Sequence, residues 1–115
     1  MQTLIIEVAS EDEALAQAIA AVEQNKPQSP RYLFDTDEAL LNTLTADRFA
    51  ILKALCGAGA MSIPELARRV KRGRTEVRAD AERLTKIGLI DLTENGDLLF
   101  PYAGVHLELE WRSAA

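Results

Sequence analysis

The stretch Ser62–Pro101 reads SIPELARRVKRGRTEVRADAERLTKIGLIDLTENGDLLFP. It opens with a helix start signal, because Ser62 and Glu65 have the S-x-x-E spacing of a capping box and Pro64 suits the first turn. Apolar residues then recur at helical spacing on one face: Ile63, Leu66, Ala67 and Val70. This pattern predicts a short helix that ends before Lys71.

A glycine-containing turn and a second helix follow. Lys71-Arg72-Gly73 interrupts the helical pattern, and Gly73 is expected to take a positive φ or to let two helices approach closely. The second helix is predicted over Arg74–Ile87, with Gly88 as a left-handed C-cap. Its inner face carries Val77, Ala81, Leu84 and Ile87. Two helices joined by so short a turn predict a helix-turn-helix.

Two short apolar runs come next, Leu89–Thr93 and Leu98–Phe100. Between them lies Asn95-Gly96, the preferred pair for a type I′ turn, so the chain is predicted to form a hairpin there. A hairpin after a helix-turn-helix is typical of a winged helix. Its tip carries Glu94 and Asp97 instead of lysine or arginine. We therefore expect this wing to stay out of a DNA minor groove, or to meet a basic partner.

A helix ending in KIG, then LI, then a short hairpin resembles the winged-helix regulators of the MarR and ArsR type. The segment RTEVRADAERLTKIGLI matches their recognition helix and first wing strand in pattern, and the resemblance covers Ala46–Tyr102. The complete sequence also resembles a small group of predicted bacterial and archaeal regulators whose genes often lie beside toxin genes. These resemblances imply a DNA-binding regulator.

The charge of the chain is unevenly placed. The formal net charge of −5 over 115 residues argues, taken alone, against a nucleic-acid partner. Between Arg68 and Lys86, however, there are eight basic and three acidic residues, so this window carries +5 and the remainder −10. A local basic face is what binding to a phosphate backbone requires. A solvated, charge-rich helix pair would give the same pattern, and this alternative stays open.

Residues at the start of the second helix meet base edges when such a helix enters the major groove. Arginine can bind guanine in bidentate fashion, and threonine can contact the thymine methyl group. The predicted base-reading residues are Arg74, Thr75, Glu76 and Arg78. The predicted phosphate contacts are Arg68, Arg69, Lys71, Arg72 and Arg83.

The segment before the motif predicts a small α/β unit. Thr3–Val8 and Arg31–Phe34 are β-rich runs, and Ser10 with Glu13 forms a capping box for a helix over Glu11–Gln24. Apolar residues of that helix repeat at helical spacing: Leu15, Ala18, Ile19 and Val22. Two further helices are predicted, one capped within residues 35–38 and containing Leu40, Leu41 and Leu44, and one that opens at Thr45 and ends at Gly57.

The end of the chain alternates strictly. Val105, Leu107, Leu109 and Trp111 take turns with His106, Glu108, Glu110 and Arg112. This predicts an amphipathic strand, which needs a neighbour because an exposed strand edge invites aggregation. We expect it to share a sheet with Thr3–Val8, either in the same subunit or in a second one.

The predicted fold class is α+β, a winged helix-turn-helix core with an N-terminal strand-helix extension and a C-terminal strand. The expected division is residues 1–44 for the extension, which packs on the core or pairs subunits, 45–104 for the winged helix-turn-helix, and 105–115 for the C-terminal strand.

No enzyme is indicated. His106 is the only histidine and Cys56 the only cysteine, so neither a catalytic triad nor a zinc site is expected, and no cofactor motif is recognised. Cys56 is expected in the core, and His106 at the surface. No run reaches the roughly 18 apolar residues of a membrane span, and no signal peptide opens the chain. A cytoplasmic protein is expected.

Two functions fit these patterns. The first is a sequence-specific transcriptional regulator, a homodimeric repressor that binds double-stranded DNA. The second is a winged helix that binds protein, for example an antitoxin that masks a basic toxin. Its contact surface would then be acidic, formed by Glu94, Asp97, Glu108 and Glu110.

Overall fold

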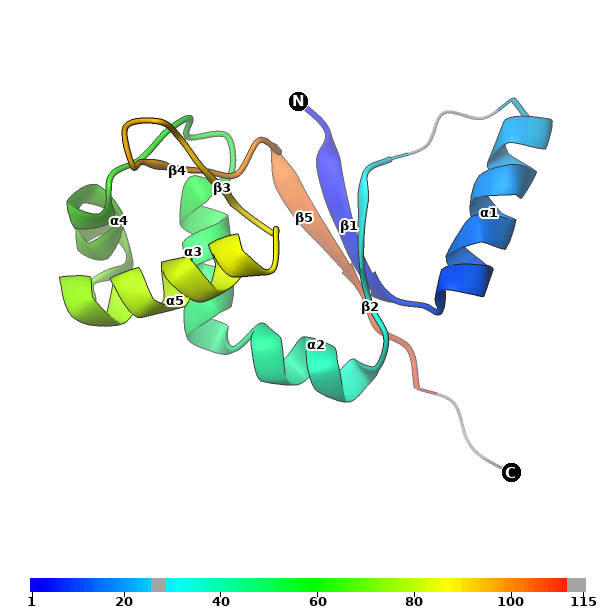
Figure 1. The fold of residues 1–115 in the computed structure, drawn as a ribbon, viewed down its shortest axis with the longest axis horizontal. Coiled ribbons are helices and arrows are strands. Elements are labelled where there is room, and N and C mark those ends of the chain that lie inside the picture. The colour runs from blue at the N-terminus through cyan, green and yellow to red at the C-terminus, as the bar shows by residue number, and fades with distance from the viewer. Residues whose placement is uncertain (26–28, 112–115) are drawn as a thin grey trace.

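A three-stranded parallel sheet lies between the winged-helix unit and the first helix (Figure 1). The computed structural model describes residues 1–25 and 29–111. The elements in chain order are β1 (Thr3–Val8), α1 (Glu11–Glu23), β2 (Arg31–Phe34), α2 (Asp37–Thr43), α3 (Ala46–Leu55), α4 (Ile63–Val70), α5 (Arg74–Lys86), β3 (Asp91–Leu92), β4 (Leu98–Leu99) and β5 (Gly104–Glu108). The fold is α+β, a winged helix-turn-helix with a strand-helix extension and a C-terminal strand, as predicted. Within the described residues, no helix has the length and apolar character to cross a membrane.

The sheet joins the two ends of the chain. Its strand order is β2-β1-β5, and β1 is parallel to both neighbours. The prediction that the terminal strands share a sheet is confirmed, within one subunit. The C-terminal strand is shorter than its alternating sequence indicated, because β1 ends at Val8 and the last paired residues are Glu7 and Glu108. Arg112 and the rest of the predicted strand after Trp111 lie outside the described residues.

Helix α1 connects two parallel strands but buries none of its side chains. Its alanines at 14, 18 and 21 are partly covered, and none of its residues is buried. The bulky side chains face solvent instead, since Leu15, Ile19 and Val22 are 60%, 50% and 74% exposed. The large apolar side chains predicted to form a stripe on this helix are therefore left uncovered within the described residues.

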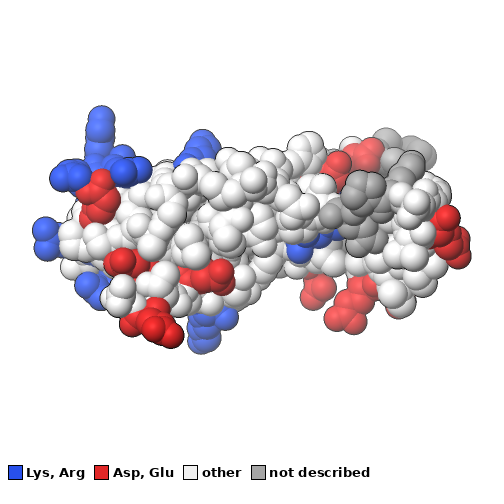
Figure 2. All heavy atoms as spheres, turned by 90° about the horizontal axis from the view of Figure 1, so that it is seen from above, with Lys and Arg blue, Asp and Glu red and all other residues white. Residues whose placement is uncertain are grey.

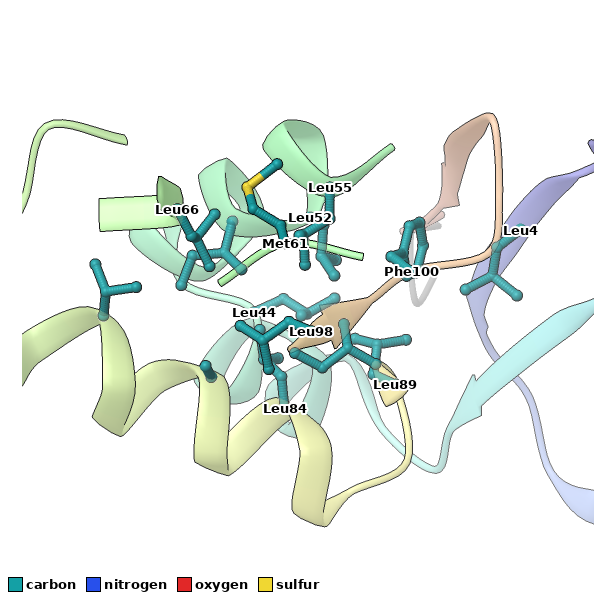
Figure 3. Packing of buried hydrophobic residues seen from close by; sticks show 14 of the residues in the cluster. Leu4, Leu44, Leu52, Leu55, Met61, Leu66, Leu84, Leu89, Leu98 and Phe100 are labelled. Atoms are coloured by element: carbon teal, nitrogen blue, oxygen red, sulfur yellow. The ribbon is translucent and has the colours of Figure 1, made fainter. Parts of the chain in front are cut away.

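Hydrophobic packing joins the sheet to the helices. One cluster of buried side chains includes Leu4 and Ile6 of β1, Leu55 of α3, Leu66 of α4 and Leu84 of α5. Figure 3 shows Phe100 between Leu4 and the leucines of the helices. Burying a side chain of this size contributes about 2 kcal/mol. The cluster therefore joins the first two predicted segments of the chain, and Val105 of the third packs against it.

The predicted N-caps are confirmed. In each, a hydroxyl oxygen accepts a hydrogen bond from the backbone N–H three residues on, which satisfies one of the donors left open at a helix start. The capping residues are Ser10, Thr36, Thr45 and Ser62.

The wing is a hairpin, but its turn differs from the predicted type I′. That turn needs a positive φ at two residues, whereas only Gly96 has one, at 83°. The Gly96 N–H donates to the Thr93 carbonyl, and the Thr93 N–H donates to the Asp97 carbonyl. The loop is therefore the three-residue form, which places a single left-handed residue at its end. Met61 adds to the other side of β4 through a two-way backbone bridge to Leu98.

A tyrosine fastens the sheet to the end of α5. The hydroxyl of Tyr32 donates to the Ile87 carbonyl at 2.6 Å. Burial raises the pKa of Tyr32 above its ordinary value of 10.0, and the nearby Arg83 partly opposes that shift. The neutral hydroxyl is thus the form that the fold favours.

Replacing Tyr32 by phenylalanine should lower the free energy of unfolding by about 1 kcal/mol, because the Ile87 carbonyl loses its donor. Since the folded-state pKa is raised, the contribution of the hydroxyl is present at neutral pH and is lost as pH rises through that pKa. Urea denaturation at pH 7 and at alkaline pH measures both effects. Tyr102→Phe is the matched control, because within the described residues its hydroxyl has no hydrogen bond; equal losses in the two variants would contradict the assignment.

Candidate nucleic-acid interface

The turn between α4 and α5 is closed by a lysine. Lys71 takes the left-handed conformation, with φ 59°, while Gly73 has φ −67° and is the N-cap of α5. The expectation of a positive φ at Gly73 is therefore wrong. The left-handed residue is needed directly after the last turn of α4, where the Arg72 N–H donates back to the Ala67 carbonyl.

Gly73 leaves space beside the first turn of α5. The Glu76 carboxylate folds back into this space, and a Cβ at position 73 would displace this exposed, flexible end of the side chain. A carboxylate there is stabilised by the positive end of the helix dipole. It also places negative charge beside the first residues of the helix.

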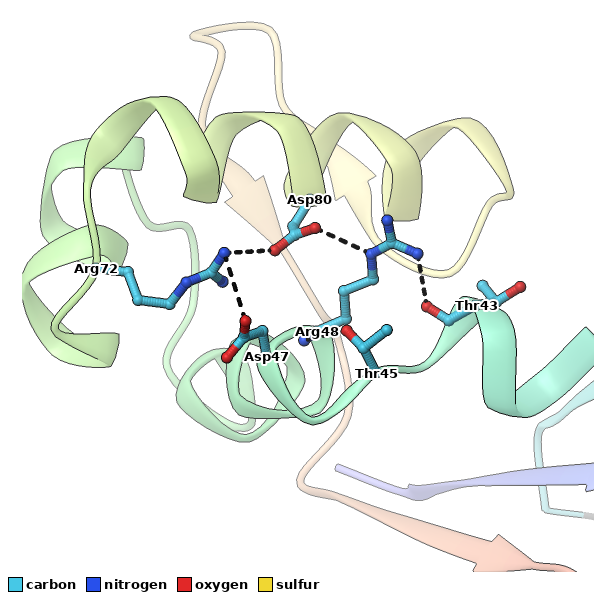
Figure 4. Close-up of polar contacts among 6 residues, drawn as sticks. All are labelled: Thr43, Thr45, Asp47, Arg48, Arg72 and Asp80. Atoms are coloured by element: carbon cyan, nitrogen blue, oxygen red, sulfur yellow. Dashed lines mark hydrogen bonds and ion pairs between the residues drawn. The ribbon is translucent and has the colours of Figure 1, made fainter.

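A half-buried carboxylate of α5 links this helix to α3 and to the turn that follows α4 (Figure 4). Asp80 of α5 accepts from Arg48 of α3 at 3.0 Å and pairs with Arg72 of the turn at 2.9 Å. The side chains of Arg48, Arg72 and Asp80 are 22%, 21% and 16% exposed. Arg48 also donates to the Thr43 carbonyl, at the end of α2. We call these three residues the Asp80 brace; it fixes where α5 begins relative to α3.

Arg72 was predicted to contact phosphate, but in the structure it pairs with Asp80. Its Nη2 also lies 3.8 Å from Asp47, and its Nη1 is buried with no hydrogen-bond partner in residues 1–25 and 29–111. A guanidinium turned inward in this way is held for positioning. Sequence reasoning missed the brace, because Arg48 and Asp80 lie in helices that carry several other charged residues, and no local pattern marks these two as partners.

The predicted base-reading residues lie together on the outer side of α5. Val77, Ala81 and Leu84 are buried against the core, whereas Arg74, Thr75, Glu76 and Arg78 are all exposed on the first two turns. Among the described residues, no carboxylate pairs with Arg74 or Arg78. Arg78 borders an apolar groove of about 470 Å³ between α5 and the wing, which Leu92 and Leu98 also line.

The residues predicted to contact phosphate differ in their ion pairing and in their position on the motif. Arg68 and Arg69 both pair with the Glu65 carboxylate, the second at 3.0 Å, but they stay 76% and 50% exposed. Exposed pairs of this kind contribute about 0–1 kcal/mol, so a phosphate can compete for these arginines. Lys71 is exposed at the turn, and Arg83 is exposed near the other end of α5, beside Tyr32.

Charge is divided between the two ends of the molecule. Figure 2 shows basic side chains around the winged-helix end, with carboxylates among them, and mostly acidic side chains at the opposite end. At the carboxyl ends of the strands, a crevice of about 810 Å³ is bordered by Glu7, Asp35, Asp37, Glu108 and Glu110. The wing tip adds Glu94, which is exposed, and Asp97, which is half-buried.

The Asp80 brace should control both stability and the placement of α5. Asp80→Ala leaves Arg48 without its carboxylate partner and Arg72 with only Asp47, at 3.8 Å, and should lower the free energy of unfolding by about 2 kcal/mol, between the values for exposed and fully buried pairs. Urea denaturation of this variant is compared with Glu82→Ala, an exposed carboxylate on the same helix that should change little. If adding Arg72→Ala does not reduce the cost of Asp80→Ala, the two residues are not coupled and the brace is disproved.

Comparisons with known proteins complete the description of this region. The family model HVO_A0114 matches residues 43–107, which is more than half of the chain. The chain is similar in structure to the multiple antibiotic-resistance repressor (MarR) from Listeria monocytogenes 4b F2365, with a TM-score of 0.47 and 12% identity. That match covers 80% of this chain and 64% of the repressor chain, so this chain spans less than two thirds of the repressor's length. The sequence matches none of the curated proteins.

Proposed function

The chain belongs to the HVO_A0114 family, and we propose that it is a DNA-binding transcriptional regulator whose helix α5 enters the major groove. The observation that carries this proposal is that two arginines of α5 are exposed and unpaired within the described residues. Arg74 and Arg78 are one helical turn apart, exposed, and without a carboxylate partner in the part of the chain that the structure describes. A protein that carries −5 overall keeps these cations free at the place where a duplex would meet the helix.

The proposed contacts divide into three kinds. Arg74, Thr75, Glu76 and Arg78 read base edges; the Glu76 carboxylate suits the amino group of cytosine. Arg68, Arg69, Lys71 and Arg83 contact phosphates and set the register of the protein on the duplex. Arg72 acts through the Asp80 brace instead, since its guanidinium is committed to Asp80.

We further propose that the regulator is a homodimeric repressor. Two copies related by two-fold symmetry would place their α5 helices in successive major grooves about 34 Å apart, and the operator would carry two inverted half-sites. The acidic wing is expected to stand away from the phosphates, because Glu94 would meet them with like charge.

A second candidate function, a protein-binding module such as an antitoxin, is favoured by one feature. The exposed stripe Leu15, Ile19 and Val22 on α1 is preceded by Glu11, Asp12 and Glu13, and no basic residue lies in the last turn of the helix. Such a surface suits a basic protein, as do Glu94, Asp97, Glu108 and Glu110. Co-expression with the product of the neighbouring gene, followed by purification of the parent and of an Ile19→Ser variant, tests this candidate.

Replacing Arg78 by alanine should weaken binding to the specific operator by about 1–3 kcal/mol and relax sequence choice at one base pair. Replacing Arg69 by alanine should weaken binding to all sequences alike and reduce the salt slope by about one. Gel shifts or fluorescence anisotropy on the upstream intergenic region, at several salt concentrations, measure both effects.

Lys53→Ala is the charge-matched control, since this exposed lysine lies on α3, outside the proposed contacts. If Arg78→Ala binds operator and random DNA as the parent does, Arg78 is not a base reader. A parent protein that binds no duplex even in dilute buffer would overturn the proposed function as a whole.

A further inference from the structure

Strand β5 has one free edge. It pairs with β1 on one side, and within residues 1–25 and 29–111 no strand or loop pairs with its other side. In a strand, alternate residues direct their N–H and C=O groups to each side, so this edge offers unpaired donors and acceptors to another strand. Five residues, Gly104–Glu108, are long enough to serve as a template.

The sequence of this edge is complementary to itself. When two copies are aligned antiparallel with Leu107 at the centre, Leu107 lies opposite the second copy's Leu107. Val105 then lies opposite the second copy's Leu109, which directly follows the strand. On the other face, His106 lies opposite the second copy's Glu108. Within one chain, His106 Nε2 is already 3.5 Å from Glu108 Oε1, so both side chains lie on that face. Cross-strand pairs of opposite polarity or of apolar side chains stabilise a sheet.

Neighbouring registers lack this match. A register centred on Glu108 sets two carboxylates opposite one another, and one centred on His106 sets two imidazoles together. A shift by a single residue turns each apolar side chain to the polar face of the other copy. Only the register centred on Leu107 satisfies both faces at once.

An apolar groove lies beside the same strand. It has a volume of about 340 Å³ and lies between α3 and β5, lined by Phe49, Leu52, Cys56, Val105 and Leu107. Leu107 is on the sheet face that turns toward the core, yet it stays 40% exposed. A second β5 alongside would bring its own leucine against this groove.

We propose that the free edge of β5 is the interface of a homodimer, in which two copies pair β5 antiparallel about Leu107 and form one continuous six-stranded sheet. The two-fold axis of such a pairing is perpendicular to the sheet, so both copies present the same face on the same side. Because Leu4 and Ile6 of β1 face the winged-helix core, both winged-helix units then lie on the same side of the joined sheet. The evidence for this interface comes from β5 alone. Its role in placing two α5 helices on one duplex rests on the proposed function.

A cross-linking experiment tests the register. In a Cys56→Ser background, Leu107→Cys puts two thiols directly opposite one another, about 5 Å apart between Cα atoms, and mild oxidation of dilute protein should give a disulfide-linked dimer. Val105→Cys is the matched control. The thiols of this variant would be offset by four residues along the paired strands, about 13 Å apart, and should not form a disulfide. Equal cross-linking of the two variants, or none for Leu107→Cys in a protein that light scattering shows to be dimeric, overturns the proposal.

Charge reversal tests the interface in solution without DNA. His106→Glu sets carboxylates opposite the second copy's Glu108 at two places and should weaken dimerisation about tenfold or more, measured by sedimentation. Adding Glu108→Lys to His106→Glu should restore it. Gln17→Glu adds the same charge on α1 and should leave dimerisation unchanged. A monomeric parent protein, or a double variant as weak as the single one, would overturn the proposal.

DNA binding is measured separately on the same variants. If the parent dimerises as described but ignores duplex DNA, the proposed function fails and the interface stands. If the parent binds DNA but His106→Glu dimerises normally, the function stands and the interface fails.

Discussion

One continuous hydrophobic cluster constrains this molecule, because both ends of the chain must reach it. Leu4 and Ile6 of β1 are buried with Phe100, which follows the wing, and with leucines of all three helices of the motif. The first and last strands can share a sheet only because this packing holds β1 against the winged-helix unit. The extension is therefore fixed to the winged-helix unit by about as much apolar burial per side chain as holds the helices to one another.

Carboxylates of the protein decide which arginines are available to a ligand. Eight basic residues lie between Arg68 and Lys86, but Asp80 draws Arg72 inward, and Glu65 holds Arg68 and Arg69 in exposed pairs. Arg74 and Arg78 are left without such partners in the described part of the chain. A stretch that looks uniformly basic in sequence is thus divided into residues that position the helix and residues that face outward.

The sheet shows a similar division between covered and uncovered surface. The larger side chains of α1 remain exposed, and within the described residues β5 keeps one unpaired edge and one partly exposed leucine. These apolar features lie away from the basic helices. An arrangement of this kind allows contacts with other chains and contacts with a polyanion to occupy different surfaces.

The sequence by itself determined what depends on neighbours a few residues apart. The caps at Ser10, Thr36, Thr45 and Ser62, the helices that they open, and the hairpin around Gly96 were all readable, since each rests on hydrogen bonds or spacings within one turn. The positive φ expected at Gly73 is the exception. The left-handed residue is Lys71, because the chain turns directly after the last turn of α4.

Only the tertiary structure decided the rest. Arg48 and Asp80 are 32 residues apart, and Thr3–Val8 meets Gly104–Glu108 across nearly the whole chain. No periodicity within a segment specifies which carboxylate meets which guanidinium, which face of α1 turns inward, or where a strand loses its partner. These follow from how the elements pack around one core, because packing sets the distances over which charges pair and backbone groups find donors and acceptors.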